Sequence, residues 1–311
     1  MPDILITEFM DETAVEDTAK TYDVHYDPHL VDKPDDLKAL LADARGLVVR
    51  NRTRVDAGLL EAAPHLKVVG RLGVGLDNID LIACEERGIT VCPATGANDA
   101  AVAEWVIATA MLLLRGAFLS KSQMMNGDWP RTGAMGHETG AKTLGLVGFG
   151  QIARYTARLA QALGMRVIAY DPYVASDDKC WTGISKIDKL HEMLRVADIV
   201  SLHVPLTDAT RHLINDKAIA QMKQGAILVN AARGGVLDED ALVTAMKSGR
   251  IRGAALDVYE TEPLTASSAA KFSDLPNLVL TPHIAGVTIE SNQRVSHVTM
   301  DNVRRVLEAS K

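Results

Sequence analysis

The stretch Thr143–Ala153, with the sequence TLGLVGFGQIA, decides the fold of this chain. Its apolar run Leu144–Val147 predicts a buried strand that ends at a glycine turn, and a helical pattern follows that turn. The apolar positions on one face of the helix are Ile152, Tyr155, Leu159 and Leu163. A second apolar run, Arg166–Tyr170, ends at Asp171. Strand, glycine turn, helix, strand and acid in this order are typical of a dinucleotide-binding unit.

The residue types in this stretch suit a dinucleotide. Gly148 permits a tight turn, and Gly150 has no Cβ, so a pyrophosphate can approach the backbone. The N–H groups of Gln151 and Ile152 open the helix and face that anion. Asp171 can accept hydrogen bonds from both ribose hydroxyls, and its charge would repel a 2′-phosphate. The pattern therefore favours NAD over NADP, and the alternative is a plain glycine-rich turn between a strand and a helix.

Length and composition limit the class of protein. The chain has 311 residues, a length that suits two domains. Hydrophobic residues make up 47% and charged residues 23%, as in a soluble globular protein with an ample core. The net charge is −7 and no block of Lys or Arg stands out, so nucleic acid is not an expected partner. No metal-ligating set is predicted.

The cysteines and the chain start predict a cytoplasmic protein. Three cysteines, Cys84, Cys92 and Cys180, form no C-x-x-C pair and are expected to be reduced thiols. The opening residues Met1-Pro2-Asp3 carry no basic segment, so no signal peptide is expected. The longest apolar segment, Val102–Leu114, is too short to span a bilayer and predicts a buried helix.

Strand and helix patterns alternate along the chain, which predicts parallel sheets with helices on both faces. Strands are expected in the first hundred residues at Ile4–Thr7, Gly46–Val49, Lys67–Val69 and Ile89–Val91. Helices are expected at Leu37–Ala44, Val55–Ala63, Leu81–Arg87, Asn98–Arg115 and Ile289–Leu307. Later strands are expected at Asp198–His203, Ala226–Val229, Gly253–Leu256 and Leu278–Leu280.

Polar residues follow the strands of the second half. They are Asp171, His203, Arg233, Asp257 and His283. In a doubly wound sheet the carboxyl ends of the strands share one edge, which is where ligands bind. One such residue would be an ordinary loop residue satisfied by hydrogen bonds, but five at one edge predict a functional site.

Two loops in the first half also contain candidate ligand-binding residues. Arg50-Asn51-Arg52 follows the strand that ends at Val49, and two arginines there can clamp an anion. They can equally be a solvated surface pair. The loop Gly73–Asn78 could hold a carboxylate on its backbone N–H groups, or be a simple turn capped by its own Asp or Asn.

Arg233, Glu262 and His283 together have the chemistry that reduction of a ketone requires. Arg233 can bind a carboxylate or polarise a carbonyl, and His283 can supply a proton near neutral pH. A carboxylate at Glu262 would stabilise the imidazolium if the two side chains touch. Sequence spacing alone cannot bring them together, and an exposed loop glutamate and a loop histidine satisfied by backbone remain the alternatives.

Along nearly its whole length the chain resembles the D-isomer-specific 2-hydroxyacid dehydrogenase family. The matching segments are Gly73–Asp80, Leu144–Ala153, Ser201–Thr207, Asn230–Gly235, Asp257–Leu264 and Thr281–Gly286. The resemblance implies NAD as cofactor and a small 2-hydroxy or 2-oxo acid as substrate. It makes Arg233 the substrate-binding arginine, Glu262 the partner carboxylate and His283 the acid/base.

The resemblance also assigns binding positions. Those implied for NAD are Gly148, Gly150, Gln151, Ile152, Asp171, His203, Val204, Pro205, Thr210, Ala231, Arg233, Asp257, His283 and Gly286. Those implied for substrate are Arg50, Arg52, Val74, Gly75, Arg233 and His283. Gln151 stands where many members have arginine, a departure that would weaken pyrophosphate binding.

The implied architecture is α/β, with two Rossmann-like doubly wound parallel-sheet domains and the cleft between them. Residues 1–98 and 288–311 would form the substrate domain, and residues 99–287 the NAD-binding domain. Members of the family usually form homodimers through the cofactor domain, and the connector Phe118–Lys142 is a candidate part of that contact.

The arginine loop bears on the choice of acid. Arginines in this loop meet the distal phosphate in similar phosphoglycerate dehydrogenases, so a substrate with a second anion is expected. The segments Ile6–Glu12 and Val49–Thr53 most resemble the members that act on (S)-3-sulfolactate and 3-sulfopyruvate. The alternatives are 3-phosphoglycerate, glycerate, and glyoxylate or hydroxypyruvate. An NADH-binding co-repressor is the alternative from another class. Glu262 argues against formate oxidation, whereas phosphite oxidation stays open.

Overall fold

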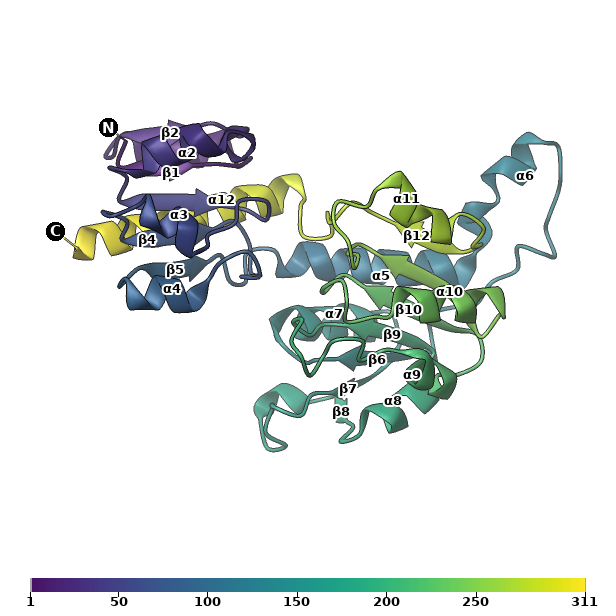
Figure 1. Ribbon diagram of the computed structural model, residues 1–311. Coiled ribbons are helices and arrows are strands. Elements are labelled where there is room, and N and C mark those ends of the chain that lie inside the picture. The colour runs from purple at the N-terminus through teal and green to yellow at the C-terminus, as the bar shows by residue number, and fades with distance from the viewer. Residues whose placement is uncertain (1, 311) are drawn as a thin grey trace. The chain divides into compact units, whose positions relative to one another are not determined.

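The computed structural model describes residues 2–310, which form two compact units. Unit 1 comprises Met1–Asn98 and Gly286–Lys311, and unit 2 comprises Asp99–Ala285. Each unit is built on its own parallel sheet with flanking helices (Figure 1). The α/β class with two parallel sheets is therefore confirmed. No helix within residues 2–310 combines the length and the apolar character that crossing a membrane needs.

The sheet of unit 1 has five strands in the order β2-β1-β3-β4-β5. Its strands are β1 (Ile4–Ile6), β2 (Val24–Tyr26), β3 (Gly46–Val49), β4 (Val68–Arg71) and β5 (Thr90–Pro93). Its helices are α1 (Glu12–Ala19), α2 (Pro34–Leu41), α3 (Ala57–Glu61), α4 (Leu81–Glu86) and α12 (Ile289–Ala309), with a 3-10 turn at Leu30–Asp32.

The C-terminal helix α12 is part of the core of unit 1. Val295, Met300, Val303 and Leu307 are buried in one cluster with side chains of the N-terminal strands. A glycine in β4 permits this close approach, since a Cβ on Gly70 would lie 2.6 Å from Cγ2 of Val303. The last residues of the chain therefore pack onto the first strands.

The sheet of unit 2 has seven strands in the order β12-β11-β10-β9-β6-β7-β8. Its strands are β6 (Thr143–Val147), β7 (Arg166–Tyr170), β8 (Ser185–Lys186), β9 (Ile199–Leu202), β10 (Ala226–Asn230), β11 (Ile251–Leu256) and β12 (Leu278–Leu280). Its helices are α5 (Asp99–Arg115), α6 (Lys121–Met125), α7 (Gln151–Ala162), α8 (Leu190–Val196), α9 (Asp216–Gln221), α10 (Glu239–Lys247) and α11 (Ala266–Ala269). Single 3-10 turns lie at Ala117–Leu119, Lys179–Trp181 and Ala270–Phe272.

Helix α7 packs against the core through small, fully buried residues together with the larger side chains of the predicted apolar face. Its buried residues are Ala153, Thr156, Ala157 and Ala160, whereas Ile152 and Leu159 are only partly buried. The small residues let α7 pack closely against the sheet and α5. This is why Ala153 can replace the third glycine of the dinucleotide pattern.

Strands β2 and β8 are not predicted from the sequence. Both are edge strands, and they contain only three and two residues. Edge strands need not be continuously apolar, because one side of the ladder and part of each face stay in water. Neither segment therefore carries the apolar run that marks a central parallel strand.

Candidate active site

One row of paired residues aligns the strand ends of unit 2. Leu280 pairs with Leu256, Leu256 with Asn230 and Asn230 with Leu202. Leu202 then pairs with Val147, and Val147 with Tyr170. The residues that directly follow this row are Thr281, Asp257, Ala231, His203, Gly148 and Asp171. Three of the five polar residues predicted at this sheet edge, Asp171, His203 and Asp257, therefore leave the sheet at the same level. Arg233 and His283 lie further along the loops that follow β10 and β12.

The glycine turn leads into α7 without a side-chain cap. Gly148 has φ 89°, and a Cβ on it would lie 2.6 Å from the carbonyl oxygen of His203. A Cβ on Gly150 would meet nothing within 4 Å, so there is open space beside this residue. No side chain caps α7, whose first turn contains Gln151 and Ile152. The first N–H groups of a helix have no partner within the helix, so an anion such as a pyrophosphate fits here.

Asp171 is fixed by the backbone around it. Its Oδ2 accepts a hydrogen bond from the N–H of Phe149 at 2.8 Å, which ties β7 to the glycine turn. Its Oδ1 accepts one from the N–H of Tyr173 at 2.9 Å. Each carboxylate oxygen can accept more than one hydrogen bond, so a ribose diol can still bind here.

The segment after β9 is held by its own side chains. The ring Nε2 of His203 lies 2.9 Å from Oγ of Ser201. Burial lowers the pKa of His203 to about 4, so the ring is neutral at physiological pH. Thr210 donates to the carbonyl oxygen of Pro205 at 2.6 Å and closes the loop that contains Val204. These contacts fix the backbone beside the glycine turn.

Arg233 lies in a loop that contacts the loop of Glu262. Asn230 fixes this loop at both ends, because its side chain accepts from the N–H of Ala232 and donates to the carbonyl oxygen of Arg233, both at 3.0 Å. A Cβ on Gly234 would lie 1.7 Å from the carbonyl oxygen of Tyr259. The two loops therefore touch through their backbones at a position where only glycine fits.

Asp257 organises the loop that contains His283. Its carboxylate accepts hydrogen bonds from the N–H groups of Ile284 and Ala285, both at 2.8 Å. Its backbone oxygen accepts one from the N–H of His283 at 2.9 Å. Burial raises the pKa of Asp257, although these hydrogen bonds and the one from Thr281 oppose the shift. The contacts hold His283 at φ 53°, a left-handed conformation that is uncommon for a residue other than glycine.

Glu262 and His283 form the pair that the sequence alone could not establish. Nδ1 of His283 lies 2.7 Å from Oε2 of Glu262, and Oε1 of Glu262 accepts from the N–H of Tyr259 at 3.0 Å. Both side chains are about a third exposed, at 37% and 31%. Within residues 2–310 no hydrogen bond is made to Nε2 of His283, so this nitrogen can face a ligand.

Charge keeps Glu262 ionised. Its burial alone would raise the pKa of the carboxyl group. The hydrogen bond with His283 and the charges of His283 and Arg233 outweigh that effect and lower the pKa. A carboxylate on Nδ1 orients the ring and leaves Nε2 for a ligand, which is the arrangement that general acid–base catalysis needs.

In unit 1 the two predicted arginines have different surroundings. Arg50 is half-buried, and its Nη1 donates to the carbonyl oxygen of Phe9 at 2.8 Å and to Oδ1 of Asn292 at 3.2 Å. Arg52 is exposed and forms an ion pair with Asp32. Within the described chain no carboxylate lies within 4.0 Å of the Arg50 guanidinium. Of the two arginines in this loop, Arg52 is paired with a carboxylate and, among residues 2–310, Arg50 is not.

The glycine loop of unit 1 lies beside the arginine loop. Nδ2 of Asn78 donates to the carbonyl oxygen of Thr53 at 2.6 Å, and Val55 forms a parallel bridge with Ile79. The loop includes Val74, which is exposed, and Gly75, which is half-buried. The structure thus brings together the substrate candidates of unit 1, and separately those of unit 2.

Comparisons with known proteins agree with this geometry. The family model "D-isomer specific 2-hydroxyacid dehydrogenase, NAD binding domain" matches residues 107–285. The (S)-sulfolactate dehydrogenase of Chromohalobacter salexigens is 54% identical over 307 residues, which are 99% of each chain. The D-3-phosphoglycerate dehydrogenase of Methanocaldococcus jannaschii is 38% identical over 99% of this chain but only 58% of its own length.

Solved structures show the same fold. The D-lactate dehydrogenase of Aquifex aeolicus, crystallised with NAD and lactic acid, has 29% identity and a TM-score of 0.88 over 98% of this chain and 96% of its own. The family match covers more than half of this chain, and the relatives extend the likeness over the rest. The chain belongs to the D-isomer-specific 2-hydroxyacid dehydrogenase family and is an NAD-dependent 2-hydroxyacid dehydrogenase.

Proposed function

We propose that this enzyme interconverts a D-type 2-hydroxy acid that carries a second anionic group and the corresponding 2-oxo acid, such as (S)-3-sulfolactate and 3-sulfopyruvate. The observation that carries the proposal is Arg50, a half-buried cation with no carboxylate in ion-pair distance among residues 2–310. A cation withdrawn from water is stabilised by a bound anion. The 54% identity with a sulfolactate dehydrogenase supports the same substrate.

The reacting end of the substrate is assigned to unit 2. Arg233 binds the carboxylate and polarises the C2 carbonyl through its planar guanidinium. In the direction of reduction His283 donates the proton from Nε2 to the carbonyl oxygen, and Glu262 stabilises the charged ring until that transfer. In the direction of oxidation His283 accepts the hydroxyl proton. NADH, when bound, supplies the hydride to C2.

The cofactor positions are assigned by their place at the sheet edge. Gly148, Gly150, Gln151 and Ile152 would hold the pyrophosphate, and Asp171 the ribose diol. The remaining positions assigned to NAD are His203, Val204, Pro205, Thr210, Ala231, Arg233, Asp257, His283 and Gly286. Asp257 would act largely through the His283 loop, because both of its oxygens already accept hydrogen bonds from residues 281–285.

The handedness of the substrate is consistent with the family. Sulfur outranks the carboxyl carbon in the priority rules, so the spatial arrangement of D-lactate is named (S) in 3-sulfolactate. Arg50, together with Val74 and Gly75 in the neighbouring loop, is assigned to the sulfonate end. Arg52 would make a smaller contribution because it already pairs with Asp32.

Oxidation of NADH by the purified protein across five 2-oxo acids tests the proposal. The panel comprises sulfopyruvate, 3-phosphohydroxypyruvate, hydroxypyruvate, glyoxylate and pyruvate. The expected result is the highest kcat/KM for sulfopyruvate. If kcat/KM is highest for 3-phosphohydroxypyruvate, the substrate carries a second anion as proposed, but that anion is a phosphate and not a sulfonate. Preference for a mono-anion would refute the role of Arg50. NADH binding without turnover of any acid would favour the co-repressor alternative.

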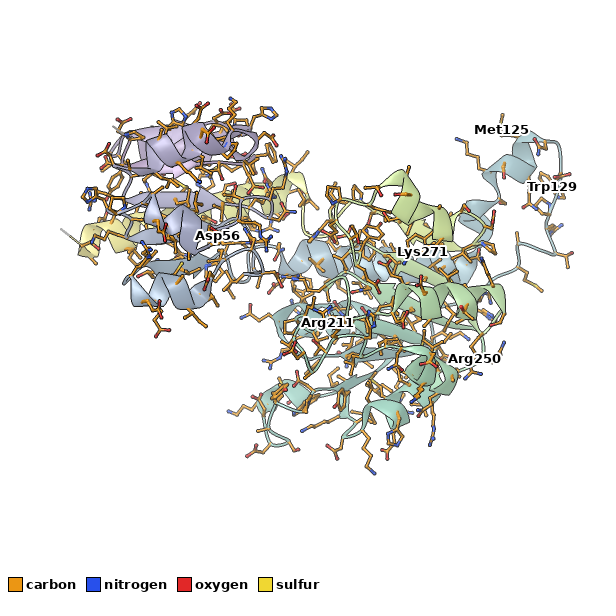
Figure 2. All side chains as sticks on the ribbon, in the orientation of Figure 1. Asp56, Met125, Trp129, Arg211, Arg250 and Lys271 are labelled. Atoms are coloured by element: carbon orange, nitrogen blue, oxygen red, sulfur yellow. The ribbon has the colours of Figure 1, made fainter. Side chains whose placement is uncertain are left out.

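We also propose a cytoplasmic homodimer that forms through the connector Phe118–Lys142. Figure 1 shows α6 in a segment that extends away from the sheet of unit 2, and Figure 2 shows Met125 and Trp129 on it. Phe118, Met125, Trp129 and Met135 are 70% or more exposed. Large apolar side chains gathered at one surface are typical of protein contacts. Sedimentation should give a dimer mass, and Met125→Ser/Trp129→Ser should shift it to the monomer. A monomeric wild type would refute the dimer.

The three free cysteines fit a reducing compartment, which supports the proposed cytoplasmic location.

A further inference from the structure

A buried glutamate holds the arginine loop of unit 1 from within. Glu8 follows β1 directly and is only 4% exposed. Its Oε1 accepts hydrogen bonds from the N–H groups of Arg50 at 2.9 Å and Thr53 at 3.0 Å. Its Oε2 accepts from Asn51 at 3.3 Å and Arg52 at 3.1 Å. Four consecutive backbone N–H groups thus converge on one carboxylate.

This arrangement determines how the loop can meet a ligand. Consecutive N–H groups that point into one concavity form an anion site, and here the protein fills that site with its own side chain. The backbone of residues 50–53 is therefore not available to an external anion. Any anion bound at this loop must be recognised by side chains, and Arg50 is the cation whose charge is not already paired.

The guanidinium of Arg50 is oriented as well. Nη1 is occupied by the carbonyl oxygen of Phe9 and by Oδ1 of Asn292, a residue of α12 that is 8% exposed. The guanidinium carbon lies 5.5 Å from the centroid of the Phe9 ring. Because these contacts use Nη1, the other N–H groups remain for a planar, bidentate contact with a sulfonate or phosphate.

Glu8 also acts on Arg50 through its charge. Burial lowers the pKa of the Arg50 guanidinium, and the negative charge of Glu8 opposes that shift. The two side chains nevertheless form no ion pair, because the carboxylate oxygens of Glu8 accept hydrogen bonds from backbone N–H groups instead. Glu8 thus favours the charged form of Arg50 without occupying its donors.

We propose that Glu8 is the positioning residue that makes this enzyme select a second anion, with Asn292 orienting the same arginine. The inference rests on the proposed function, since it presumes that Arg50 binds the distal anion. Glu8 fixes the backbone from which Arg50 projects, whereas Asn292 fixes its head group. Neither residue contacts the reacting atoms.

Glu8→Gln is the decisive variant. Glutamine keeps the size of the side chain but offers one acceptor oxygen, so its amide group must face two backbone N–H donors. Kinetics with sulfopyruvate and with pyruvate separate the distal anion from the shared 2-oxo acid. Glu16→Gln is the matched control, because it removes one negative charge from an exposed position of α1. Asn292→Ala removes one of the two acceptors at Nη1 of Arg50 and introduces a good helix former. Arg50→Ala serves as reference.

For Glu8→Gln we expect kcat/KM with sulfopyruvate to fall roughly 10–100-fold, mostly through KM, since buried donors lose their acceptors. With pyruvate kcat and KM should stay within about threefold of wild type. Asn292→Ala should show the same split at about three- to tenfold, and Glu16→Gln should match wild type. If Glu8→Gln fails to fold, the split in Asn292→Ala decides the proposal.

Two results overturn the inference and can be told apart. If wild type prefers sulfopyruvate and Arg50→Ala abolishes that preference, but Glu8→Gln or Asn292→Ala retains it, only the positioning role is wrong. The same holds if Glu8→Gln lowers kcat equally for both substrates, because that would indicate a general structural role. If wild type has no preference for sulfopyruvate or 3-phosphohydroxypyruvate over mono-anions, the proposed function fails and the role of Glu8 with it.

Discussion

At the scale of single residues, the proposed acid–base chemistry depends on side chains that are far apart in the sequence but in contact in the structure. His283 and Glu262 are 21 positions apart and meet at 2.7 Å. The residue types suggested acid–base chemistry, but their spacing could not distinguish a catalytic pair from two loop residues. The backbone contacts of Asp257 and Tyr259 make the difference, because they aim both side chains at one point.

Replacement of His283 tests the proposed acid/base. His283→Ala should lower kcat by roughly 10²–10⁴-fold, since it removes the proton donor. The dissociation constant for NADH, measured by fluorescence titration, should change little, because most of the assigned cofactor contacts remain. His191→Ala, an exposed histidine of α8 in the same unit, should behave as wild type. Turnover of His283→Ala near the wild-type rate would rule out the role.

The two arginines of unit 1 should differ in their effects. Arg50→Ala should raise KM for a dianionic 2-oxo acid, because the loss of a charged hydrogen bond weakens the binding free energy by about 1–3 kcal/mol. Arg52→Ala should cost less than about 1 kcal/mol, because Arg52 is exposed and its pair with Asp32 is screened by water. Steady-state kinetics with sulfopyruvate measure both effects. Equal effects would show that the ion pair with Asp32 opens in solution to bind substrate.

Glu8 shows what residue-level pattern reading misses. It stands one position past the expected N-terminal strand and looks like an ordinary polar residue at a strand end. The available signal was a carboxylate at the carboxyl edge of the sheet, where the arginine loop also begins. Its four backbone partners lie 42 to 45 positions away, so only the folded structure reveals the contact.

At the scale of elements, the turn between β6 and α7 has two glycines with different constraints. Gly148 has a positive φ and no room for a Cβ, whereas Gly150 has φ −75° and open space beside it. The sequence predicted both residues as parts of one binding turn. The structure separates them, because one is required for folding and the other only leaves space.

This difference predicts opposite outcomes for two substitutions. Gly148→Ala should destabilise the fold by about 1–3 kcal/mol or more, because the backbone is left-handed and a neighbouring carbonyl clashes. Gly150→Ala should leave the midpoint of urea unfolding nearly unchanged but weaken NADH binding. Chemical unfolding and fluorescence titration separate the two effects. Equal loss of stability in both variants would contradict the assignment.

Asp198 directly precedes β9 and links the start of that strand to the starts of β6 and β10. Its contribution to the free energy of unfolding should depend on pH. Its carboxylate accepts from the N–H of Thr143 at 2.8 Å, at the start of β6, and from Nζ of Lys223 at 2.5 Å, ahead of β10. Burial would raise the pKa of Asp198, but the bonds from Lys223 and Thr143 lower it. A lowered pKa gives stability that is present above the unfolded pKa and lost as pH falls through the folded one.

Asp198→Asn should therefore destabilise the protein by about 1–2 kcal/mol near pH 7. The difference from wild type should begin to shrink below about pH 4, near the unfolded pKa, and should disappear as the pH falls through the lower folded pKa of Asp198, where the folded carboxyl group takes up a proton. Urea unfolding at pH 7 and at acid pH measures this. A penalty that is constant over the whole range would show that charge does not contribute.

At the scale of the whole molecule, alternating strands and helices were enough to predict two parallel sheets. The central strands are mainly apolar, because helices cover both faces, and these strands were found from the sequence. The short edge strands β2 and β8 lack that signal. The fully buried residues of α7 were not predicted, because they are small and carry little hydrophobic signal, whereas the larger side chains of the predicted face do pack against the core.

The residues that we assign to the site divide between the two units. In unit 1 the loops after β1, β3 and β4 carry Glu8, Arg50 and the glycine loop that begins at Gly73. In unit 2 the loops after β10 and β12 carry Arg233 and His283. Each set therefore lies at the carboxyl edge of its own parallel sheet, where open α/β sheets bind ligands. We propose that unit 1 binds the second anion and that unit 2 binds the reacting carbon.

The most direct test of this account is the initial rate of NAD reduction with three 2-hydroxy acids at equal concentration. They are (S)-3-sulfolactate, its (R) enantiomer and D-lactate. Of the two sulfolactates we expect turnover of the (S) enantiomer only, with a higher kcat/KM than for D-lactate. Turnover of the (R) enantiomer would contradict the assigned handedness, and a higher kcat/KM for D-lactate would contradict selection of a second anion by Arg50.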